Sequence, residues 1–522
     1  MITTYHDAVA RLSRREWLNA AWALGAAAVL HPIISTRIHA QAPAFKVNPF
    51  TLGVASGDPL PDAVVIWTRL APDPLAGGGM PMTAVDVTWE VARDERFQTV
   101  VRNGTAVARP ELGHSVHVDV TGLEPGREYW YRFRAGGEAS DTGRTKTAPA
   151  EGARVDRVRF AVCGCAHYEF GYYTAYRGVA EEHFDFAIHT GDYIYEGRSN
   201  PRAVRHHHGD ECYSLDDYRA RYAQYKLDPD LRAVHHSTPF IVIADDHEVI
   251  NNYAGDYDPR GTPTEVFRLR RAAAYQAYYE HMPLRAAAIP DGSHMRMYRR
   301  LQFGSLVDLH MLDTRQWRTD QACGDGYRTA CREAEAPDRT MMGAEQEAWL
   351  FRNLATRRGQ WTVIGQQVPT FALDRRAVDA NGRFSMDRWD GYVHARQRLY
   401  QRLHETRAAN PIVLSGDVHQ HYAAELKMGS ARSIPVGVEL TNTSISSGGD
   451  GADVSTEWPR IQSDNPQVKF HSSRRGYIAC TVTPAQLHAD FRVVERISLP
   501  DQPLRTAATV VVDAGRSAAN LA

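Results

Sequence analysis

Three polar motifs, each placed directly after a short apolar run, constrain the fold of this chain more than any other feature. The apolar runs at residues 184–188, 240–244 and 412–414 are bounded by turn residues, which predicts strands buried on both faces. The motifs that follow them are Gly-Asp-Tyr-Ile-Tyr-Glu at 191–196, Asp-Asp-His-Glu at 245–248 and Ser-Gly-Asp-Val-His at 415–419. Since ligands of open α/β sheets bind beyond the carboxyl ends of the strands, we expect the motifs to meet in one crevice and hold a pair of metal ions.

Strands that alternate with helical stretches predict a layered α/β core from about residue 157 onward. The earlier part of the chain differs, because short strands separated by turns follow one another, which predicts an all-β sandwich. Within it, the stretch Leu-Glu-Pro-Gly-Arg-Glu-Tyr-Trp-Tyr at 123–131 resembles the turn and aromatic strand of fibronectin III-like domains. The expected fold class is therefore α/β, with a β-sandwich in front of a layered sheet core.

Length and charge set wider limits. A chain of 522 residues is too long for one compact core, so we expect two or more domains. The formal net charge at pH 7 is −2, and basic residues are scattered, so we expect no stable nucleic acid partner. The expected segments are a signal peptide over 1–40, a fibronectin III-like sandwich over 45–150, a catalytic domain over 151–512 and a frayed polar C-terminal tail over 513–522.

The first forty residues have the pattern of a secretory signal. Ser-Arg-Arg-Glu-Trp-Leu at 13–18 precedes an apolar run at 20–30 and small residues near Ala40. The adjacent arginines resemble the twin-arginine type of signal, which predicts the twin-arginine export machinery as a partner. The alternative is an uncleaved anchor, but the apolar run is too short to span a bilayer. We therefore expect a periplasmic or extracellular protein without a transmembrane anchor in the mature chain.

Export bears on the six cysteines, because disulfides form in oxidising compartments. Cys323 and Cys331 flank a polar, Gly-rich loop and are candidates for a disulfide that closes this loop. The other four cysteines show no disulfide framework.

The side chains of the three motifs suit two cations held close together. Such a site needs one carboxylate that bridges both ions, together with ligands specific to each ion. Asp192, just past a buried strand, is the natural bridge, and Tyr195 can add a phenolate, which favours a hard metal such as Fe(III). Asp246 and His419 come from other strand ends, and Asp417 shares a turn with His419. Each motif alone also fits a turn or a helix cap, but three of them in one α/β domain favour a metal site.

Two further features lie outside these motifs. Arg315 follows a buried strand, and its guanidinium fork suits a phosphate, although a structural salt bridge is an equally good interpretation. The three histidines at 206–208 lie in a polar loop, where we expect them to be solvated rather than to bind a metal.

The motifs together resemble a known family. Further matching stretches are Cys165, Asn-Asn-Tyr at 251–253, Leu-Asp-Thr-Arg-Gln at 312–316 and Thr-Ser-Ile-Ser-Ser-Gly-Gly at 443–449. The whole set resembles the PhoD-type alkaline phosphatases, which are secreted members of the calcineurin-like metallophosphoesterase superfamily. The resemblance covers essentially the whole mature chain, including the N-terminal sandwich and the twin-arginine signal. It implies a metallophosphoesterase sheet core in the catalytic domain.

The resemblance implies a role for individual residues. The implied ligands of Fe(3+) are Cys165, Asp192, Tyr195 and His419, and the implied ligands of Ca(2+) at the second site are Asp192, Asp246 and Asp417. Thiolate, phenolate and imidazole suit iron, whereas carboxylate oxygens suit calcium. His247 would face the phosphate or protonate the leaving group. His167, two residues after Cys165, is expected to be a supporting polar residue. Cys163 is expected either to be buried or to pair with Cys165 on oxidation.

The implied function is hydrolysis of phosphate monoesters and diesters. Water activated by the metal pair attacks phosphorus in line, without a covalent enzyme intermediate, and the likeness suggests phosphate scavenging outside the cytoplasm. The nearest alternative is a phosphodiesterase of the phospholipase D type that acts on lipid head groups. The alternative from another class is a non-catalytic metal- or phosphate-binding surface protein, which the intact ligand set disfavours.

Overall fold

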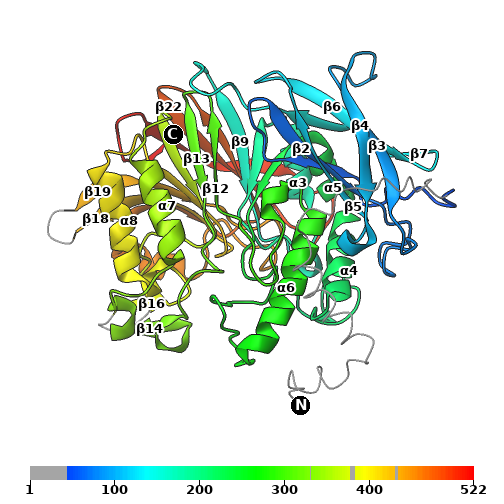
Figure 1. The fold of residues 1–522 in the computed structure, drawn as a ribbon. Coiled ribbons are helices and arrows are strands. Elements are labelled where there is room, and N and C mark those ends of the chain that lie inside the picture. The colour runs from blue at the N-terminus through cyan, green and yellow to red at the C-terminus, as the bar shows by residue number, and fades with distance from the viewer. Residues whose placement is uncertain (1–43, 330, 377–381, 430–432) are drawn as a thin grey trace.

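The computed structural model of the protein describes residues 44–329, 331–376, 382–429 and 433–522 (Figure 1). Two large mixed sheets form its centre, and the observed α/β class agrees with the expected one. The predicted signal peptide lies outside the described residues.

The first large sheet has ten strands. In spatial order they are β24 (Asn520–Leu521), β23 (Leu504–Asp513), β22 (Gln486–Val494), β21 (Gly476–Val482), β9 (Val158–Cys163), β10 (Phe186–His189), β11 (Phe240–Val242), β1 (Val54–Gly57), β2 (Ala63–Arg69) and β5 (Ser115–Thr121). Strands β9, β10 and β11 run parallel to one another, so their carboxyl ends meet at one edge. Two of the three predicted apolar runs, at 184–188 and 240–244, form β10 and β11.

The second large sheet has seven strands. In spatial order they are β12 (Arg299–Phe303), β13 (Val307–Met311), β15 (Trp361–Gly365), β17 (Ile412–Ser415), β19 (Ile434–Thr441), β18 (His421–Met428) and β20 (Val468–Ser472). The third predicted apolar run, at 412–414, forms β17, which pairs in parallel with β15 and β19. Apolar side chains of both sheets, such as Ile188 and Val363, belong to one buried core, so the two sheets pack face to face.

Helices cover the outer faces of these sheets, as Figure 1 shows. The helices are α3 (Thr174–Glu181), α4 (Leu215–Lys226), α5 (Pro229–Ser237), α6 (Thr264–His281), α7 (Gly343–Leu354), α8 (Val393–Glu405) and α9 (Trp458–Ile461). Helices α7 and α8 share a core with the seven-stranded sheet through residues such as Leu350, Leu399 and Val413. Helix α4 begins with a capping box, because the Ser214 side chain accepts from the backbone of Asp217 while the Asp217 side chain accepts in return.

Three of the N-terminal strands, β1, β2 and β5, belong to the ten-stranded sheet, whereas the other five form a small sheet of their own. A five-stranded sheet of β3 (Val85–Ala92), β4 (Val100–Ala108), β6 (Glu128–Ala135), β7 (Glu138–Ala139) and β8 (Gly143–Lys146) faces β1, β2 and β5 across a shared apolar core. However, β1 also pairs in parallel with β11, with Gly57 opposite Phe240. A Cβ atom at Gly57 would lie 2.6 Å from the carbonyl oxygens of Phe240 and Pro283, so glycine permits this close approach.

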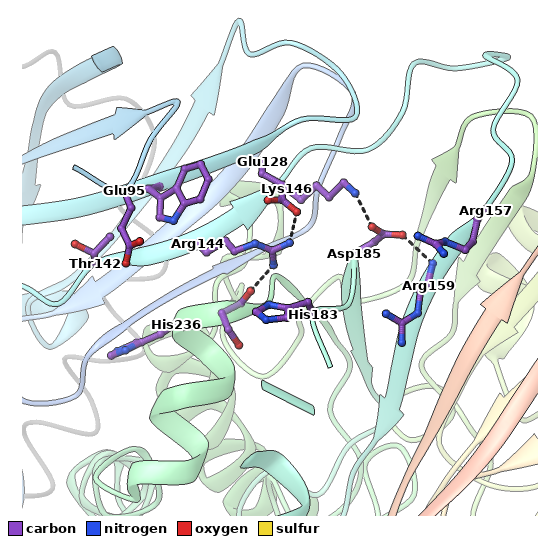
Figure 2. A pocket seen from close by; sticks show the side chains of 12 residues that line it. Glu95, Glu128, Thr142, Arg144, Lys146, Arg157, Arg159, His183, Asp185 and His236 are labelled. Carbon is purple, nitrogen blue, oxygen red and sulfur yellow. Dashed lines mark hydrogen bonds and ion pairs between the residues drawn. The ribbon is translucent and has the colours of Figure 1, made fainter. Parts of the chain in front are cut away.

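A cavity of about 630 Å³ lies between the small sheet and the amino ends of β9 and β10 (Figure 2). Its charged groups are mostly paired with one another: Lys146 Nζ lies 2.6 Å from Asp185, and Arg144 bonds Glu128 and the Ser237 carbonyl oxygen. The cavity lies at the opposite strand ends from the three polar motifs.

The C-terminal segment is ordered, which corrects the expected frayed tail over 513–522. Strand β24 pairs with β23, and the Gly515 N–H donates to the Asn410 side chain at 2.6 Å. The expectation rested on the polar composition of the segment. Its order comes instead from backbone pairing with β23 and from the buried side chain of Ala519, which is 7% exposed. The disulfide expected between Cys323 and Cys331 is present.

Lys226 is a buried ammonium at the end of α4, and it predicts a pH-dependent stability. It is 2% exposed, its Nζ lies 4.3 Å from the centroid of the Trp67 ring, and no ion-pair partner for it occurs among the described residues. Burial lowers the pKa of Lys226 from 10.5 to about 7. Between pH 7 and pH 10.5 this lysine is therefore protonated in the unfolded chain but mostly neutral in the folded one. The free energy that the buried charge costs the folded state is largest below pH 7 and shrinks as the pH rises toward 10.5.

We expect Lys226→Met to raise the free energy of unfolding at pH 6. A gain of roughly 1–3 kcal/mol follows, because removing a buried charge outweighs the lost cation–π contact. The gain should be smaller at pH 9, and urea unfolding at both pH values measures the difference. The control is Lys427→Met, a partly exposed lysine paired with Glu425, which should show no such pH dependence. An equal gain for Lys226→Met at both pH values would contradict the prediction.

Candidate metal centre

Four loops that follow strands of the two large sheets bring the predicted ligands together. Cys165 follows β9, Asp192 follows β10, Asp246 follows β11, and both Asp417 and His419 follow β17. Each of these side chains belongs to a group whose possible ligand atoms all lie within 4.8 Å of one another. The sheets therefore deliver the motifs to one crevice, as the strand pattern predicts.

The backbone of these loops is strained at the predicted ligands. The residues with left-handed backbone are Cys165 (φ 56°), Asp192 (φ 55°), Asp417 (φ 64°) and His419 (φ 53°). Such a conformation costs a residue other than glycine about 1–3 kcal/mol and persists only where surrounding contacts enforce it. Here the loops bond one another, since the Cys165 N–H donates to the Gly191 carbonyl at 3.0 Å and the Ala166 N–H to the Asp192 carbonyl at 2.9 Å.

The first group of possible ligands consists of Cys165, Asp192 and His419. Tyr195 adjoins it, because its phenol donates to Asp192 Oδ2 at 2.9 Å and lies 3.0 Å from His419 Nε2. Ser447, to which the sequence assigned no role, places its hydroxyl 2.6 Å from the Tyr195 oxygen and 2.7 Å from the Cys165 carbonyl oxygen, and it can donate to one of them at a time. All four predicted iron ligands thus lie together, with Cys165, Asp192 and Tyr195 buried and His419 partly exposed.

Burial dominates the protonation of this group. It raises the pKa of Cys165, Asp192 and Tyr195 well above their ordinary values, and the negative charge of Asp192 adds to the effect on the thiol and the phenol. Burial also lowers the pKa of His419 to about 3, so its imidazole is neutral. A cation would reverse the first effect, because metal binding removes protons from its ligands.

The second group is acidic and consists of Asp245, Asp246 and Asp417. Two of its buried oxygen atoms, Asp245 Oδ2 and Asp246 Oδ1, have no hydrogen-bond partner among the described residues. Buried carboxylate oxygens without partners are costly unless a cation binds them, so this group fits a hard metal ion. Asp245 was not among the predicted ligands, although it directly precedes Asp246 in the same motif.

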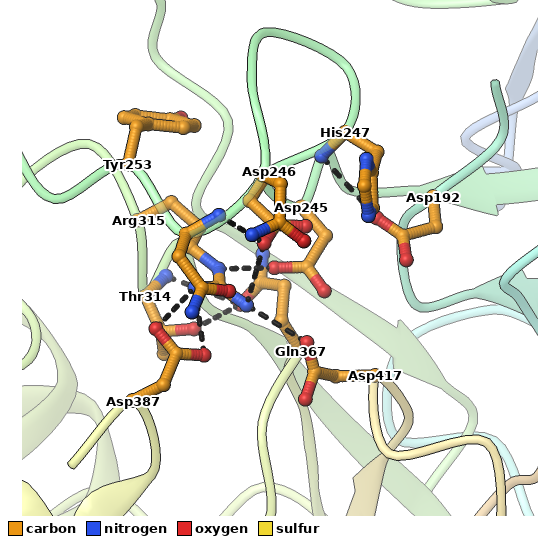
Figure 3. Close-up of polar contacts among 12 residues, drawn as sticks. Asp192, Asp245, Asp246, His247, Tyr253, Thr314, Arg315, Gln367, Asp387 and Asp417 are labelled. Atoms are coloured by element: carbon orange, nitrogen blue, oxygen red, sulfur yellow. Dashed lines mark hydrogen bonds and ion pairs between the residues drawn. The ribbon is translucent and has the colours of Figure 1, made fainter. Parts of the chain in front are cut away.

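Arg315 lies at the centre of the acidic group, as Figure 3 shows. Its side chain is buried, Nη1 donates to Asp387 at 2.9 and 3.0 Å, and Nη2 donates to Asp417 at 2.9 Å. It also bonds Asp245, and its Nη2 lies 3.5 Å from Asp246. This is the salt-bridge interpretation of Arg315, and each nitrogen that a phosphate could reach already has a carboxylate partner. No sequence pattern singled out Asp387.

His247 stands between the two groups and is held by Glu196. Its Nδ1 lies 2.7 Å from Glu196 Oε2, while the other oxygen of Glu196 accepts from the Asn251 N–H at 3.0 Å. Burial by itself lowers the pKa of His247, but the charges of Glu196, Asp246 and Asp192 outweigh burial and raise the pKa well above its ordinary value. The ring of His247 also lies 4.1 Å from that of Tyr195, centroid to centroid.

His167 lies beside the first group as a supporting residue. Its Nδ1 accepts from the Glu169 N–H at 3.3 Å, and its ring lies 4.2 Å from that of Tyr195. His207 corrects one expectation, since it is buried, 6% exposed, and its Nε2 lies 3.0 Å from the Tyr225 hydroxyl. His207 is buried because the buried Glu169 side chain accepts a hydrogen bond from its backbone N–H at 3.1 Å and so holds this part of the loop against the protein.

A free cysteine, Cys163, and the loop closed by the Cys323–Cys331 disulfide lie next to the site. Cys163 is buried and unpaired, and its thiol points to the Ile188 carbonyl rather than to Cys165. The loop closed by the Cys323–Cys331 disulfide reaches the acidic group through Asp325, which accepts from the Asn252 side chain at 2.6 Å. The Asn252 N–H in turn donates to Asp246 at 2.6 Å.

Comparison with known proteins identifies the family of this chain. A family model of PhoD-like phosphatases matches residues 160–491, and a model of the N-terminal domain of PhoD-like phosphatases matches residues 36–149. The chain is 48% identical to alkaline phosphatase D of Bacillus subtilis (strain 168) over 477 residues, 90% of this chain and 82% of that protein. A solved structure described as PhoD matches with a TM-score of 0.90 at 47% identity, over 92% of this chain and 93% of that one. This chain therefore belongs to the PhoD-like phosphatase family.

Proposed function

We propose that this chain is a metal-dependent phosphoric ester hydrolase of the alkaline phosphatase D type. The observation that carries the proposal is the pair of adjacent ligand groups, one with thiol, phenol and imidazole and one with carboxylates only, joined through Asp192 and Asp246. Its substrates are phosphate monoesters and diesters. When bound, two such cations neutralise the charge of a phosphoryl group and lower the pKa of water.

The first group is proposed to hold Fe(3+), with Cys165, Asp192, Tyr195 and His419 as ligands. Two properties of the donor set support this choice. The set offers thiolate, phenolate and imidazole donors that suit iron, and its three acidic groups supply three negative charges when deprotonated. Asp192 is the proposed bridge, because its side chain belongs both to this group and to a group with Asp246 and His247.

The second group is proposed to hold Ca(2+), with Asp192, Asp246 and Asp417 as ligands. When the four carboxylates around Arg315 are ionised they carry four negative charges, and Arg315 and Arg318 return two positive charges. The carboxylates thus outnumber these guanidinium groups, which favours a cation at this position. Arg315 is proposed to support the phosphate site indirectly, since its charge keeps the acidic residues close together despite their repulsion.

His247 is the proposed proton donor to the leaving group. Glu196 holds Nδ1, so Nε2 is the ring atom left to deliver a proton to the oxygen of the departing alcohol. The charge of Glu196, the largest of the charges that raise the pKa of His247, favours the protonated imidazole that a general acid requires. No side chain of the chain is assigned as a covalent nucleophile.

Export and domain organisation complete the proposal. The signal pattern at 1–40 supports twin-arginine export and phosphate scavenging outside the cytoplasm. No helix in the described part of the chain is both long and apolar enough to cross a bilayer. The facing sheets of the N-terminal region support the fibronectin III-like assignment of 45–150, ahead of a catalytic domain from 151 onward.

Metal analysis combined with turnover tests this function. We expect about one iron per chain together with calcium, a visible charge-transfer band, and hydrolysis of an aryl phosphomonoester and an aryl phosphodiester. In the control variant Cys165→Ser the band should weaken and shift, because the thiolate is lost. Zinc or manganese pairs with turnover would remove the assigned roles of Cys165 and Tyr195. Turnover of choline lipids in preference to both aryl esters would favour the phospholipase D alternative, and metal without any turnover would favour the non-catalytic one.

A further inference from the structure

Glu248 makes an unusual set of contacts for a charged residue. It is fully buried at 0% exposure, and no cationic side chain pairs with it in the described part of the chain. Its two carboxylate oxygens accept three backbone N–H groups. Oε1 accepts from Tyr193 at 2.6 Å, while Oε2 accepts from Asp245 at 2.7 Å and from Asp192 at 3.1 Å. Both carboxylate oxygens thus accept hydrogen bonds from the backbone of two loops.

These two loops carry the residues that the proposed function needs most. One contains Asp192, whose backbone is left-handed, and the other contains Asp246. The loops also touch at their closest point, since a Cβ atom at Gly191 would lie 2.3 Å from the Asp245 Cβ atom. Glu248 bonds the loops on both sides of this contact. The spacing between Asp192 and Asp246 is therefore set partly by a residue that is itself in neither ligand group.

A carboxylate is the side chain that this position requires. Two oxygens with two lone pairs each can accept three converging N–H groups, whereas the amide of glutamine has one acceptor oxygen and an NH₂ group that donates. In a glutamine variant at least one N–H would face another donor. A buried N–H without a partner costs about 1–3 kcal/mol, so the loops would shift to relieve it.

We propose that Glu248 is a positioning residue, which fixes the spacing of Asp192 and Asp246 before any cation binds. The inference rests on the proposed function, because it takes these two aspartates as ligands. The Glu248 oxygens bond backbone N–H groups and no side chain of a proposed ligand. It acts by holding the two loops in the strained arrangement that the ligands share, so the ions meet a site that is already formed rather than one they must assemble.

Metal titration of chelator-treated protein tests this role. Mature wild-type protein and Glu248→Gln are titrated with Fe(3+) followed by absorption and with Ca(2+) followed by calorimetry. We expect the variant to bind at least one of the two ions about 10- to 100-fold more weakly. At saturating ion concentrations its KM for an aryl phosphate should stay close to that of the wild type. Unchanged affinity for both ions in a folded variant would overturn the inference.

The matched control is Glu280→Gln. Glu280 is also fully buried, and it pairs with Arg219 at 2.6 Å, next to the N-terminal strands and away from both ligand groups. This variant should lose thermal stability while it keeps the wild-type affinity for both ions. Equal weakening of metal binding in both variants would show a general effect of stability and would overturn the inference. If the wild type itself binds no ion and hydrolyses no ester, the proposed function fails instead.

Hydrogen exchange provides a test without any variant. In the metal-free wild type, the amides of Asp192, Tyr193 and Asp245 should exchange slowly, because their N–H groups already donate hydrogen bonds to Glu248. Mass spectrometry of peptides that cover 190–196 and 243–249 measures this protection with and without ions. Fast exchange that becomes slow only after metal is added would show that the ions form the loops, and this result would overturn the inference.

Discussion

Asp192→Asn is expected to lower kcat/KM for an aryl phosphate by about 10³-fold or more, and to reduce the bound metal below two ions per chain. The reason is the position of Asp192 between the two ligand groups, where its carboxylate can contact both cations. An asparagine keeps the size of the side chain but has only one oxygen and no charge, so it cannot bridge. Steady-state kinetics together with elemental analysis measures both effects.

The control for this variant is Asp308→Asn. Asp308 is also buried and bonds Arg300 at 2.6 and 2.7 Å, but it lies on β13, before the loop that carries Arg315. It should lose some stability and keep both metal content and turnover. If Asp192→Asn retained the activity of the wild type, the assignment of Asp192 as the bridge would be wrong.

His247→Asn is expected to lower kcat by about 10²- to 10⁴-fold, with the larger loss for alkyl phosphates. An alkoxide is a poor leaving group and needs the proton that His247 Nε2 is proposed to supply, whereas a nitrophenolate leaves without it. Metal content should change little, because His247 lies outside both proposed sets of ligands. Comparing kcat for an alkyl and a nitrophenyl ester on the same enzyme measures the difference.

His404→Asn is the matched control, since His404 is an exposed residue of α8 and should have no effect on either ester. An equal loss of kcat for the two leaving groups would count against proton donation by His247. That result would instead favour a role of the imidazole in contacting the phosphoryl group, the other role that the resemblance implied.

The strands and the loop ends of this protein were predictable because their signals are local. A short apolar run between turn residues specifies a buried strand, and the acidic motif after it needs no knowledge of the rest of the chain. The runs before Asp192, Asp246 and Asp417 therefore appear as β10, β11 and β17, close to the expected residues. The disulfide between Cys323 and Cys331 was predictable for the same reason, since both cysteines flank one loop.

The missed features depend on contacts between residues that are distant in sequence. Asp387 reaches Arg315 from a different loop, and Ser447 reaches Tyr195 across 252 residues. Nothing in the local sequence distinguishes Asp387 from many other aspartates, and the family-like stretch that contains Ser447 gave no role to this serine. Arg315 shows the same limit, because its position after a strand was clear while its partners, which decide between phosphate binding and a salt bridge, were not.

The pairing of β1 with β11 has a consequence for how the chain is assembled during synthesis. β1 leaves the ribosome long before β11, its parallel partner, has been made, so the N-terminal region cannot complete its hydrogen bonding while it emerges. Until β11 arrives, the edge of β1 is open, and open edges can pair with other chains. Nascent chains interrupted before about residue 240 should therefore be prone to aggregate, and removing the N-terminal region from the finished protein would expose the matching edge of β11.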